Sequence, residues 1–131
     1  MKINIPTDKK IIQGTIADYY FMDNGILVSL SKSPKRTIEN IRANKELIAQ
    51  ITGNKKVPLL IYLTSSPMPN KATRKYVNQV LPEMYTAMAM ISDNGLGKFI
   101  MNVLFKFNKP VIPMKSFSNE ADAVAWLKDY L

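Results

Sequence analysis

The sequence predicts a single α/β domain with a mixed, mainly parallel sheet of four to five strands, an N-terminal hairpin and about four helices. An Asn24-Gly25 turn between two β-prone runs predicts the hairpin. Later apolar runs alternate with helix signals, which favours parallel strands joined by right-handed crossovers. The length of 131 residues, with 47% hydrophobic and 21% charged residues, is typical of one globular domain. We therefore expect residues 1–131 to form one unit.

The N-terminal region contains the predicted hairpin. Residues 1–14 mix isoleucines with lysines and a proline, a pattern that fits a tail or a short edge strand. Residues 17–22 and 26–30 form the two arms of the hairpin. Tyr19, Tyr20 and Phe21 alternate in direction along the first arm, so at least one aromatic side chain is expected to face away from the core.

A first helix is predicted after the hairpin, beginning at Ser33-Pro34 or at Thr37. Its apolar face recurs at helical spacing, and Gly53 is well placed to end it in a left-handed cap. The face consists of Ile38, Ile41, Ile48 and Ile51. We expect this helix to cover the sheet.

The middle of the chain predicts a buried strand, a second helix and another strand. Val57–Leu63 is an unbroken apolar run, which suits a central strand covered on both faces. Asn70 can cap a second helix that runs until Pro82. Residues 86–91 then form a strand of small residues.

The C-terminal part predicts a third helix, an edge strand and a fourth helix. In the third helix Lys98, Asn102 and Lys106 form a narrow polar stripe, and the remaining positions are apolar. Residues 110–115 lie between prolines, which suits an edge strand. Ser118 or Asn119 then caps a final helix, in which Trp126 is expected to cover one margin of the core.

Composition excludes much catalytic chemistry. The chain has no cysteine and no histidine, which removes disulfides, thiolate zinc sites and imidazole-activated nucleophiles. The ten acidic residues are scattered, without a close pair suited to acid–base work. A serine–lysine pair from Ser65 or Ser66 with Lys71 has no supporting motif. We expect no enzyme activity, no metal site and no cofactor.

The net charge of +8 attracts nucleic acid, anionic lipid or an acidic partner. Only Arg36, Arg42 and Arg74 are arginines, so lysine dominates and specific nucleic-acid recognition is disfavoured. No acidic residue occurs from Asn94 to Asn119, which predicts one local basic surface. A secretory signal and a transmembrane segment are not apparent, and a cytoplasmic location is expected.

From residue 57 onward, four stretches carry a resemblance to a known family. They are Val57-Pro-Leu-Leu-Ile-Tyr-Leu63, Ala87-Met-Ala-Met-Ile-Ser92, Phe107-Asn-Lys-Pro-Val-Ile-Pro113 and the block Phe117–Leu127. Over residues 56–131 the chain resembles small bacterial proteins of unknown function with a STAS-like (SpoIIAA-like) fold. The resemblance implies a mixed sheet flanked by helices and a role in protein–protein regulation, sometimes with a small-molecule or lipid ligand, and it does not imply catalysis.

The resemblance also implies candidate phospho-acceptors. In regulatory STAS proteins a serine after the central strand, in an Asp-Ser-Ser/Thr-Gly setting, is phosphorylated by a partner kinase. Ser65 and Ser66 match these serines loosely, because the preceding aspartate and the following glycine are missing. The alternative is that both hydroxyls cap the loop or the next helix.

The loops that follow the strands are candidate ligand sites, because ligands of open parallel sheets bind outside the carboxyl ends of the strands, near the point where strand order reverses. Gly95-Leu96-Gly97-Lys98 could present backbone N–H groups to an anion, although a simple turn with Asp93 or Asn94 as the helix cap is favoured. The full set of strand-end candidates is Ser31, Thr64, Asp93, Asn94, Gly95 and Gly97.

The apolar excess of the third helix leads to the functional hypothesis. Met101 and Phe105 either pack in the core or project into a partner, a second copy or an apolar ligand, and Lys98 and Lys106 would steer an acidic partner. We favour a non-enzymatic STAS-like module that binds another protein or its own copy. The alternatives are a carrier of an apolar small molecule or lipid and a weak, non-specific nucleic-acid binder.

Overall fold

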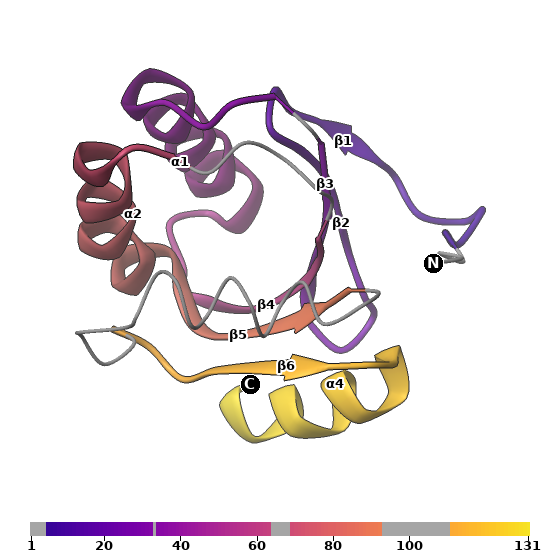
Figure 1. The fold of residues 1–131 in the computed structure, drawn as a ribbon. Helices are drawn as coiled ribbons and strands as arrows, with labels where there is room; N and C mark the ends of the chain where they lie inside the picture. The colour runs from indigo at the N-terminus through magenta and orange to yellow at the C-terminus, as the bar shows by residue number, and fades with distance from the viewer. Residues whose placement is uncertain (1–4, 33, 64–68, 93–110) are drawn as a thin grey trace.

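The computed structural model describes residues 5–32, 34–63, 69–92 and 111–131. These residues form a six-stranded sheet whose strand order follows the chain (Figure 1). The strands are β1 (Ile12–Gln13), β2 (Ala17–Phe21), β3 (Leu27–Ser31), β4 (Val57–Tyr62), β5 (Tyr85–Ile91) and β6 (Met114–Phe117).

The sheet is mixed, as predicted. β1, β2 and β3 pair antiparallel, whereas β3, β4, β5 and β6 pair parallel. The turn between β2 and β3 contains Asn24 and Gly25, and Gly25 has a φ of 95°, which a glycine adopts without strain. The sixth strand, beyond the four to five predicted, is β1 at one edge, so of the two expectations for the N-terminal residues, a tail or a short edge strand, the structure has the edge strand at Ile12–Gln13.

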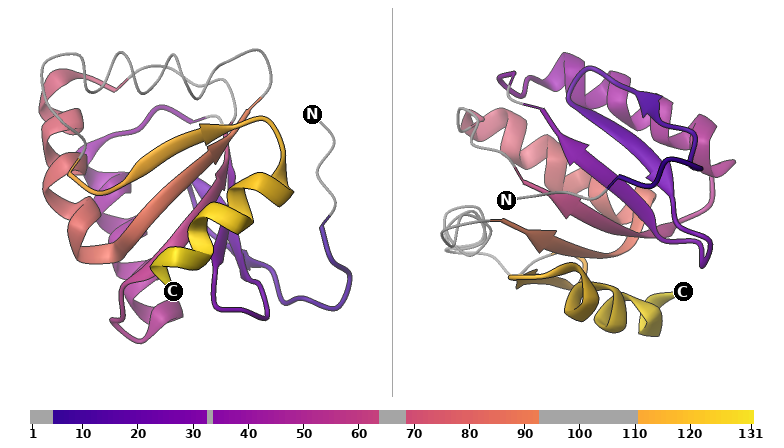
Figure 2. Two further views of the ribbon diagram at one scale, coloured as in Figure 1. Left: turned by 90° about the horizontal axis from the view of Figure 1, so that it is seen from below. Right: turned by 90° about the vertical axis from the view of Figure 1, so that its right-hand side faces the viewer.

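Three α-helices of the described residues cover the two faces of the sheet. α1 (Ile38–Thr52) and α2 (Lys71–Met84) lie on one face, and α4 (Glu120–Leu127) lies on the other, followed by the 3₁₀ turn η1 (Lys128–Tyr130) (Figures 1 and 2). The third helix predicted from the sequence lies outside the described residues.

Each face of the sheet carries its own core. Leu27, Leu59 and Tyr85 pack with the helices α1 and α2, whereas Val28 and Leu60 pack with α4. The buried part of β4 is therefore covered on both sides, as the unbroken apolar run predicted.

Two aromatic residues of β2 belong to opposite cores. Tyr19 is 2% exposed on the α1 side, and Tyr20 is 1% exposed on the α4 side. The expectation that an aromatic faces away from the core is wrong for this pair, because the sheet has no uncovered face at β2. Trp126 is half-buried against Phe117 and Tyr130, with ring centroids 5.7 and 5.0 Å away, and covers a margin of the second core.

The ends of α1 follow its predicted caps. Of the two predicted starts, the structure selects Thr37, whose side chain accepts a hydrogen bond from the N–H of Asn40 while the Asn40 side chain accepts one from the N–H of Thr37. Gly53 ends the helix in the left-handed conformation with a φ of 64°.

Two element boundaries differ from the prediction. α2 continues past Pro82 to Met84, because a proline in the last turn removes only one N–H and Leu81 and Met84 gain burial in the first core. β6 occupies Met114–Phe117 instead of residues 110–115. Pro113 has no N–H, and it precedes the strand with its carbonyl accepting from the N–H of Met88 at 2.9 Å.

Candidate functional site: the carboxyl edge of the sheet

The carboxyl ends of β3, β4 and β5 lie at one edge of the sheet because these strands are parallel. α1 follows β3 and α2 follows β4, so both helices begin at this edge. Ser31 is the last residue of β3, is half-buried and pairs with Ala17 of β2.

Most of the candidate residues predicted from the sequence lie outside the described residues. They are the strand-end residues Thr64, Asp93, Asn94, Gly95 and Gly97, the serines Ser65 and Ser66, and the third-helix residues Lys98, Met101, Phe105 and Lys106. Their roles stay predictions.

The reversal of strand order expected near the strand-end loops is not present among the described strands. The order of the six described strands follows the chain without reversal, and α1 and α2 lie on the same face. A crevice of the doubly wound type forms where helices change from one face to the other between neighbouring strands. The described strands β3, β4 and β5 contain no such point, so that argument no longer supports Ser31.

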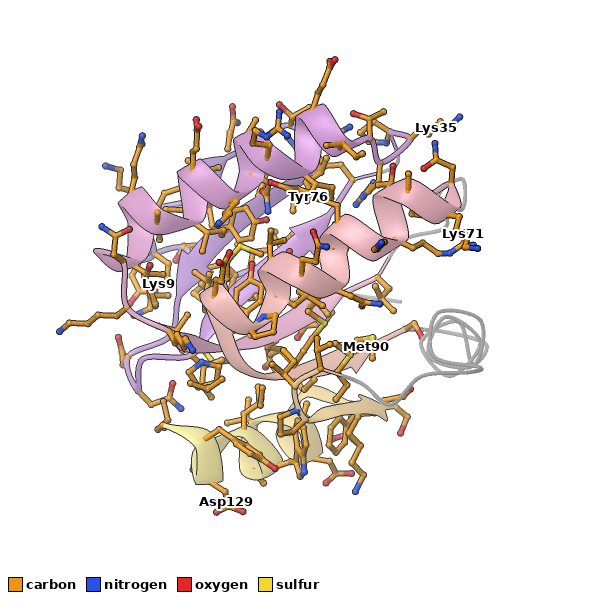
Figure 3. The ribbon with its side chains drawn as sticks, turned by 90° about the vertical axis from the view of Figure 1, so that its left-hand side faces the viewer. Lys9, Lys35, Lys71, Tyr76, Met90 and Asp129 are labelled. Carbon is orange, nitrogen blue, oxygen red and sulfur yellow. The ribbon has the colours of Figure 1, made fainter. Side chains whose placement is uncertain are left out.

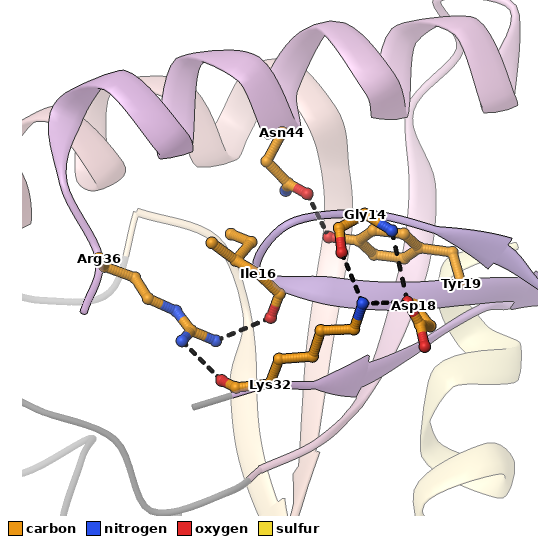
Figure 4. A network of polar contacts seen from close by, with 7 residues as sticks. All are labelled: Gly14, Ile16, Asp18, Tyr19, Lys32, Arg36 and Asn44. Atoms are coloured by element: carbon orange, nitrogen blue, oxygen red, sulfur yellow. Dashed lines mark hydrogen bonds and ion pairs between the residues drawn. The ribbon is translucent and has the colours of Figure 1, made fainter. Parts of the chain in front are cut away.

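Arg36 is fully engaged by backbone at this edge (Figure 4). Its guanidinium donates to the carbonyl oxygens of Lys32 and Pro34, each at 2.6 Å, and of Ile16 at 3.0 Å. Burial lowers the pKa of Arg36 from its ordinary value. The Arg36 side chain therefore joins the β3–α1 connection to Ile16, the residue that precedes β2.

Lys32 forms the adjacent part of the same network. Its Nζ donates to the carbonyl oxygen of Gly14 at 2.8 Å and pairs with Asp18 Oδ1 at 2.8 Å. The N–H of Gly14 donates to the same Asp18 oxygen at 3.3 Å. A Cβ at Gly14 would meet the carbonyl oxygen of Ala17 at 2.6 Å, so the close approach requires glycine. Lys32 and Asp18 therefore hold the β1–β2 connection in place.

The buried tyrosines at this edge serve packing, not proton transfer. Tyr19 donates its hydroxyl to Asn44 Oδ1 at 2.7 Å, which joins β2 to α1, and burial raises the pKa of Tyr19 to about 12. On the other face Tyr62 donates to Glu120 Oε1 at 2.5 Å, which joins β4 to the first turn of α4. Burial and the Glu120 carboxylate raise the pKa of Tyr62 well above its ordinary value of 10.0. Both hydroxyls stay protonated at neutral pH.

Sequence reasoning missed a basic surface where α1 and α2 begin. Lys35 and Lys71 lie at the same end of the two-helix layer (Figure 3). Arg42 on α1 and Lys75 on α2 are also exposed. The signal was the run Lys71-x-x-Arg74-Lys75 directly after the helix cap Asn70, where acidic residues are usual.

Neither a metal cluster nor a membrane-spanning helix is found in the described part of the chain. No group of three or more Asp, Glu, His or Cys residues there could hold a metal ion. Helices long and apolar enough to cross a bilayer are likewise missing from those residues.

The arrangement of helices and strands is that of the SpoIIAA-like class of α/β folds. It is similar to the crystal structure of an uncharacterized protein from the DUF3478 family with a SpoIIAA-like fold from Shewanella loihica PV-4. The TM-score is 0.52 at 19% sequence identity, over 97% of this chain and 98% of that chain. This likeness confirms the predicted fold.

The chain belongs to a family described as a domain of unknown function (DUF7793), whose model matches residues 20–131. The match includes every parallel strand and all three described α-helices. No curated protein matches the sequence.

Proposed function

We propose that the protein is a non-enzymatic STAS-like module that works by binding another protein. The observation that carries the proposal is that the polar side chains at the carboxyl edge fall into two groups, one hydrogen-bonded within the fold and one exposed to solvent. Arg36, Lys32, Asp18 and Tyr62 are held in hydrogen bonds that fix the fold. At the starts of α1 and α2, four cations instead face solvent, where they attract an acidic partner: Lys35, Arg42, Lys71 and Lys75.

The test of this function is reconstitution with a partner. The tagged full chain is purified from the cells that make it, and each co-purifying protein is then produced separately and titrated against it by calorimetry. We expect a saturable complex of fixed stoichiometry between purified components. Recovery of the chain with no protein that rebinds it would contradict the proposal.

Native mass spectrometry of the freshly purified protein separates this function from that of a carrier. A binding module should appear at the mass of the bare chain or of a simple oligomer. A retained apolar ligand would instead support a small-molecule or lipid carrier and would count against the proposal.

The segment 98–107 is proposed as a second, separate contact surface, with Met101 and Phe105 as anchors and Lys98 and Lys106 as steering charges. The test compares the solution mass of the wild type with that of the double variant Met101→Glu, Phe105→Glu, whose fold is checked by circular dichroism. A dimer that becomes a folded monomer supports self-association through this segment. A variant that unfolds places both residues in the core and overturns the assignment.

Ser65 and Ser66 are proposed as phospho-acceptors, because they follow β4 in the sequence. The carboxyl end of β4 lies at the edge of the sheet where α1 and α2 begin. A phosphate would add nearly two negative charges there and compete with an acidic partner. The intact mass of protein isolated from its own cells should show a fraction carrying one phosphate that maps to Ser65 or Ser66. Its absence under all growth conditions would remove the proposal.

A further inference from the structure

We infer that the starts of α1 and α2 together form a docking surface for an acidic segment of another protein. The surface, called here the basic face, consists of Lys35, Arg42, Lys71, Arg74 and Lys75. The inference rests on the proposed function, because it names the chemistry of the partner and the place on the module where it binds.

The basic face is one surface because α1 and α2 lie side by side on the sheet. The guanidinium carbon of Arg42 lies 5.7 Å from the centre of the Tyr76 ring, so the first halves of the two helices are in contact. Figure 3 shows Tyr76 between the helices and Lys35 and Lys71 at the same end of the layer. Cations from both helices can therefore meet a single bound segment.

The cations of the basic face have no carboxylate partner within the described residues. The ion pairs there lie elsewhere and join Lys9 to Asp23, Lys32 to Asp18 and Lys45 to Glu83. Within residues 38–45 and 71–77, the first two turns of α1 and α2, Glu39 is the one acidic residue. With five cations and this one carboxylate, the region carries an excess of positive charge that acidic side chains can complement.

The start of α2 carries positive side chains at the end where its helix dipole is also positive. The N-terminal end of a helix is positive, so acidic residues stabilise it and cations destabilise it. α1 has Glu39 in its first turn, and α4 has Glu120 and Asp122. α2 has no acidic residue there and begins at Lys71. Cations at this position lower the stability of the helix and make no ion pair within the described residues. Such a cost to stability is expected at a site that serves binding.

The composition of the face favours a protein partner over nucleic acid. The Tyr76 ring lies beneath Arg42, so that face of the ring is not open for stacking with a base. Arg74 donates to the carbonyl oxygen of Pro69 at 2.7 Å, so its guanidinium is held in place beside the start of α2. Arginine and tyrosine set among lysines suit carboxylates on a folded or extended polypeptide.

The test uses the full chain and a fluorescein-labelled oligoglutamate peptide as the probe, with binding followed by fluorescence anisotropy at low ionic strength. The double variant Lys71→Glu, Lys75→Glu reverses two exposed charges of the basic face. The matched control is Lys55→Glu, Lys56→Glu, which reverses two exposed lysines beyond the opposite end of α1. Both variants therefore lower the net charge equally.

We expect the Lys71→Glu, Lys75→Glu variant to bind the peptide at least about tenfold more weakly than the wild type, and the control to change binding less than about twofold. Circular dichroism and thermal unfolding should show the first variant folded and at least as stable as the wild type, because its new charges suit the dipole of α2.

Three results would overturn the inference. The first is equal weakening by both variants, which would mean that net charge alone attracts the peptide. The second is no binding of the peptide by the wild type. The third is tighter binding of a labelled oligothymidylate that the Lys71→Glu, Lys75→Glu variant abolishes, which would assign the basic face to nucleic acid. A failure here leaves the partner reconstitution above unaffected, so the two proposals fail separately.

Discussion

Arg36 illustrates how single residues at the carboxyl edge are assigned. It is an arginine in a basic protein, yet its guanidinium is surrounded by three backbone carbonyl oxygens from two separate segments. Lys35, the preceding residue, is exposed and belongs to the basic face. Two neighbouring cations thus have different roles: Arg36 donates hydrogen bonds to the backbone, whereas Lys35 is exposed to solvent.

Replacing Arg36 by alanine should therefore destabilise the fold. The substitution leaves partly buried carbonyl oxygens without donors, and we expect the free energy of unfolding to fall by about 1–3 kcal/mol. Urea unfolding measures the change, with Lys35→Ala as the matched control expected within about 0.5 kcal/mol of the wild type. A similar loss in both variants would show that the hydrogen bonds of Arg36 do not stabilise this connection.

Tyr19 gives a prediction for alkaline pH. Its pKa is raised to about 12 in the folded protein from an ordinary value of 10.0. Below about pH 10 the side chain is neutral in both the folded and the unfolded state, so its contribution to the free energy of unfolding is at its maximum. Between about pH 10 and 12 the unfolded chain loses this proton while the folded chain keeps it, so stability falls as pH rises.

Wild-type protein should lose about 2–3 kcal/mol of unfolding free energy over that interval through Tyr19. A Tyr19→Phe variant loses the hydrogen bond to Asn44 and should be less stable at pH 8, but its stability should fall less steeply above pH 10. Urea unfolding across this range is the measurement. Parallel curves for the two proteins would show that Tyr19 does not titrate as described.

At the scale of elements, helix ends that carry a capping residue were predicted more reliably than strand edges and than the C-terminal end of α2. Thr37, Asn70 and Gly53 carry cap chemistry that is local in sequence, so the structure places the caps of α1 and the start of α2 as expected. β1 is defined only by pairing with β2, and the β6 boundary depends on a hydrogen bond to β5. Such boundaries require non-local contacts that a single sequence does not display.

The left-handed cap of α1 can be tested through Gly53. A Cβ at this position meets nothing within 4 Å, so any effect of a substitution is conformational rather than steric. We expect Gly53→Ala to lower the free energy of unfolding by about 1 kcal/mol and Gly53→Asn to lower it by less, because asparagine tolerates the left-handed region better. Equal losses in thermal unfolding would argue against the cap as the cause.

The charge pattern at the start of α2 predicts a gain of stability on mutation. Lys71→Glu places a carboxylate in the first turn, and we expect an increase of about 0.3–1 kcal/mol in the free energy of unfolding at low salt. The gain should shrink as salt is added. Urea unfolding at two ionic strengths measures both effects, and a salt-independent loss of stability would show that Lys71 makes a structural contact.

At the scale of the whole molecule, the candidate site was predicted less completely than the fold. The family resemblance placed residues 56–131 in the correct fold class, and the hairpin signal placed β2 and β3. The basic face was missed because its cations on α1 and α2 are far apart in sequence, and the two helices come together only on packing, where Arg42 contacts the Tyr76 ring. The reversal of strand order expected near the strand-end loops does not occur among the described strands, because the order of strands in a sheet is decided by non-local pairing.

The two cores share one sheet, so they should unfold together. Ile48→Ala removes a buried side chain beneath α1, and Leu127→Ala removes one beneath α4. Each should cost about 2–5 kcal/mol and shift a single urea transition that is seen alike by circular dichroism and by the fluorescence of Trp126. Separate transitions for the two probes in either variant would show that the faces are independent.

The sequential strand order bears on how the protein is made. Each of the six described strands pairs with its neighbour in the chain. The sheet can therefore extend one strand at a time as the chain leaves the ribosome. α4 follows all six described strands in the chain, and until it docks, the α4-side face of the nascent sheet at Tyr20, Val28 and Leu60 is open to water. Docking of α4 therefore decides whether the nascent sheet completes its second core or is bound by chaperones.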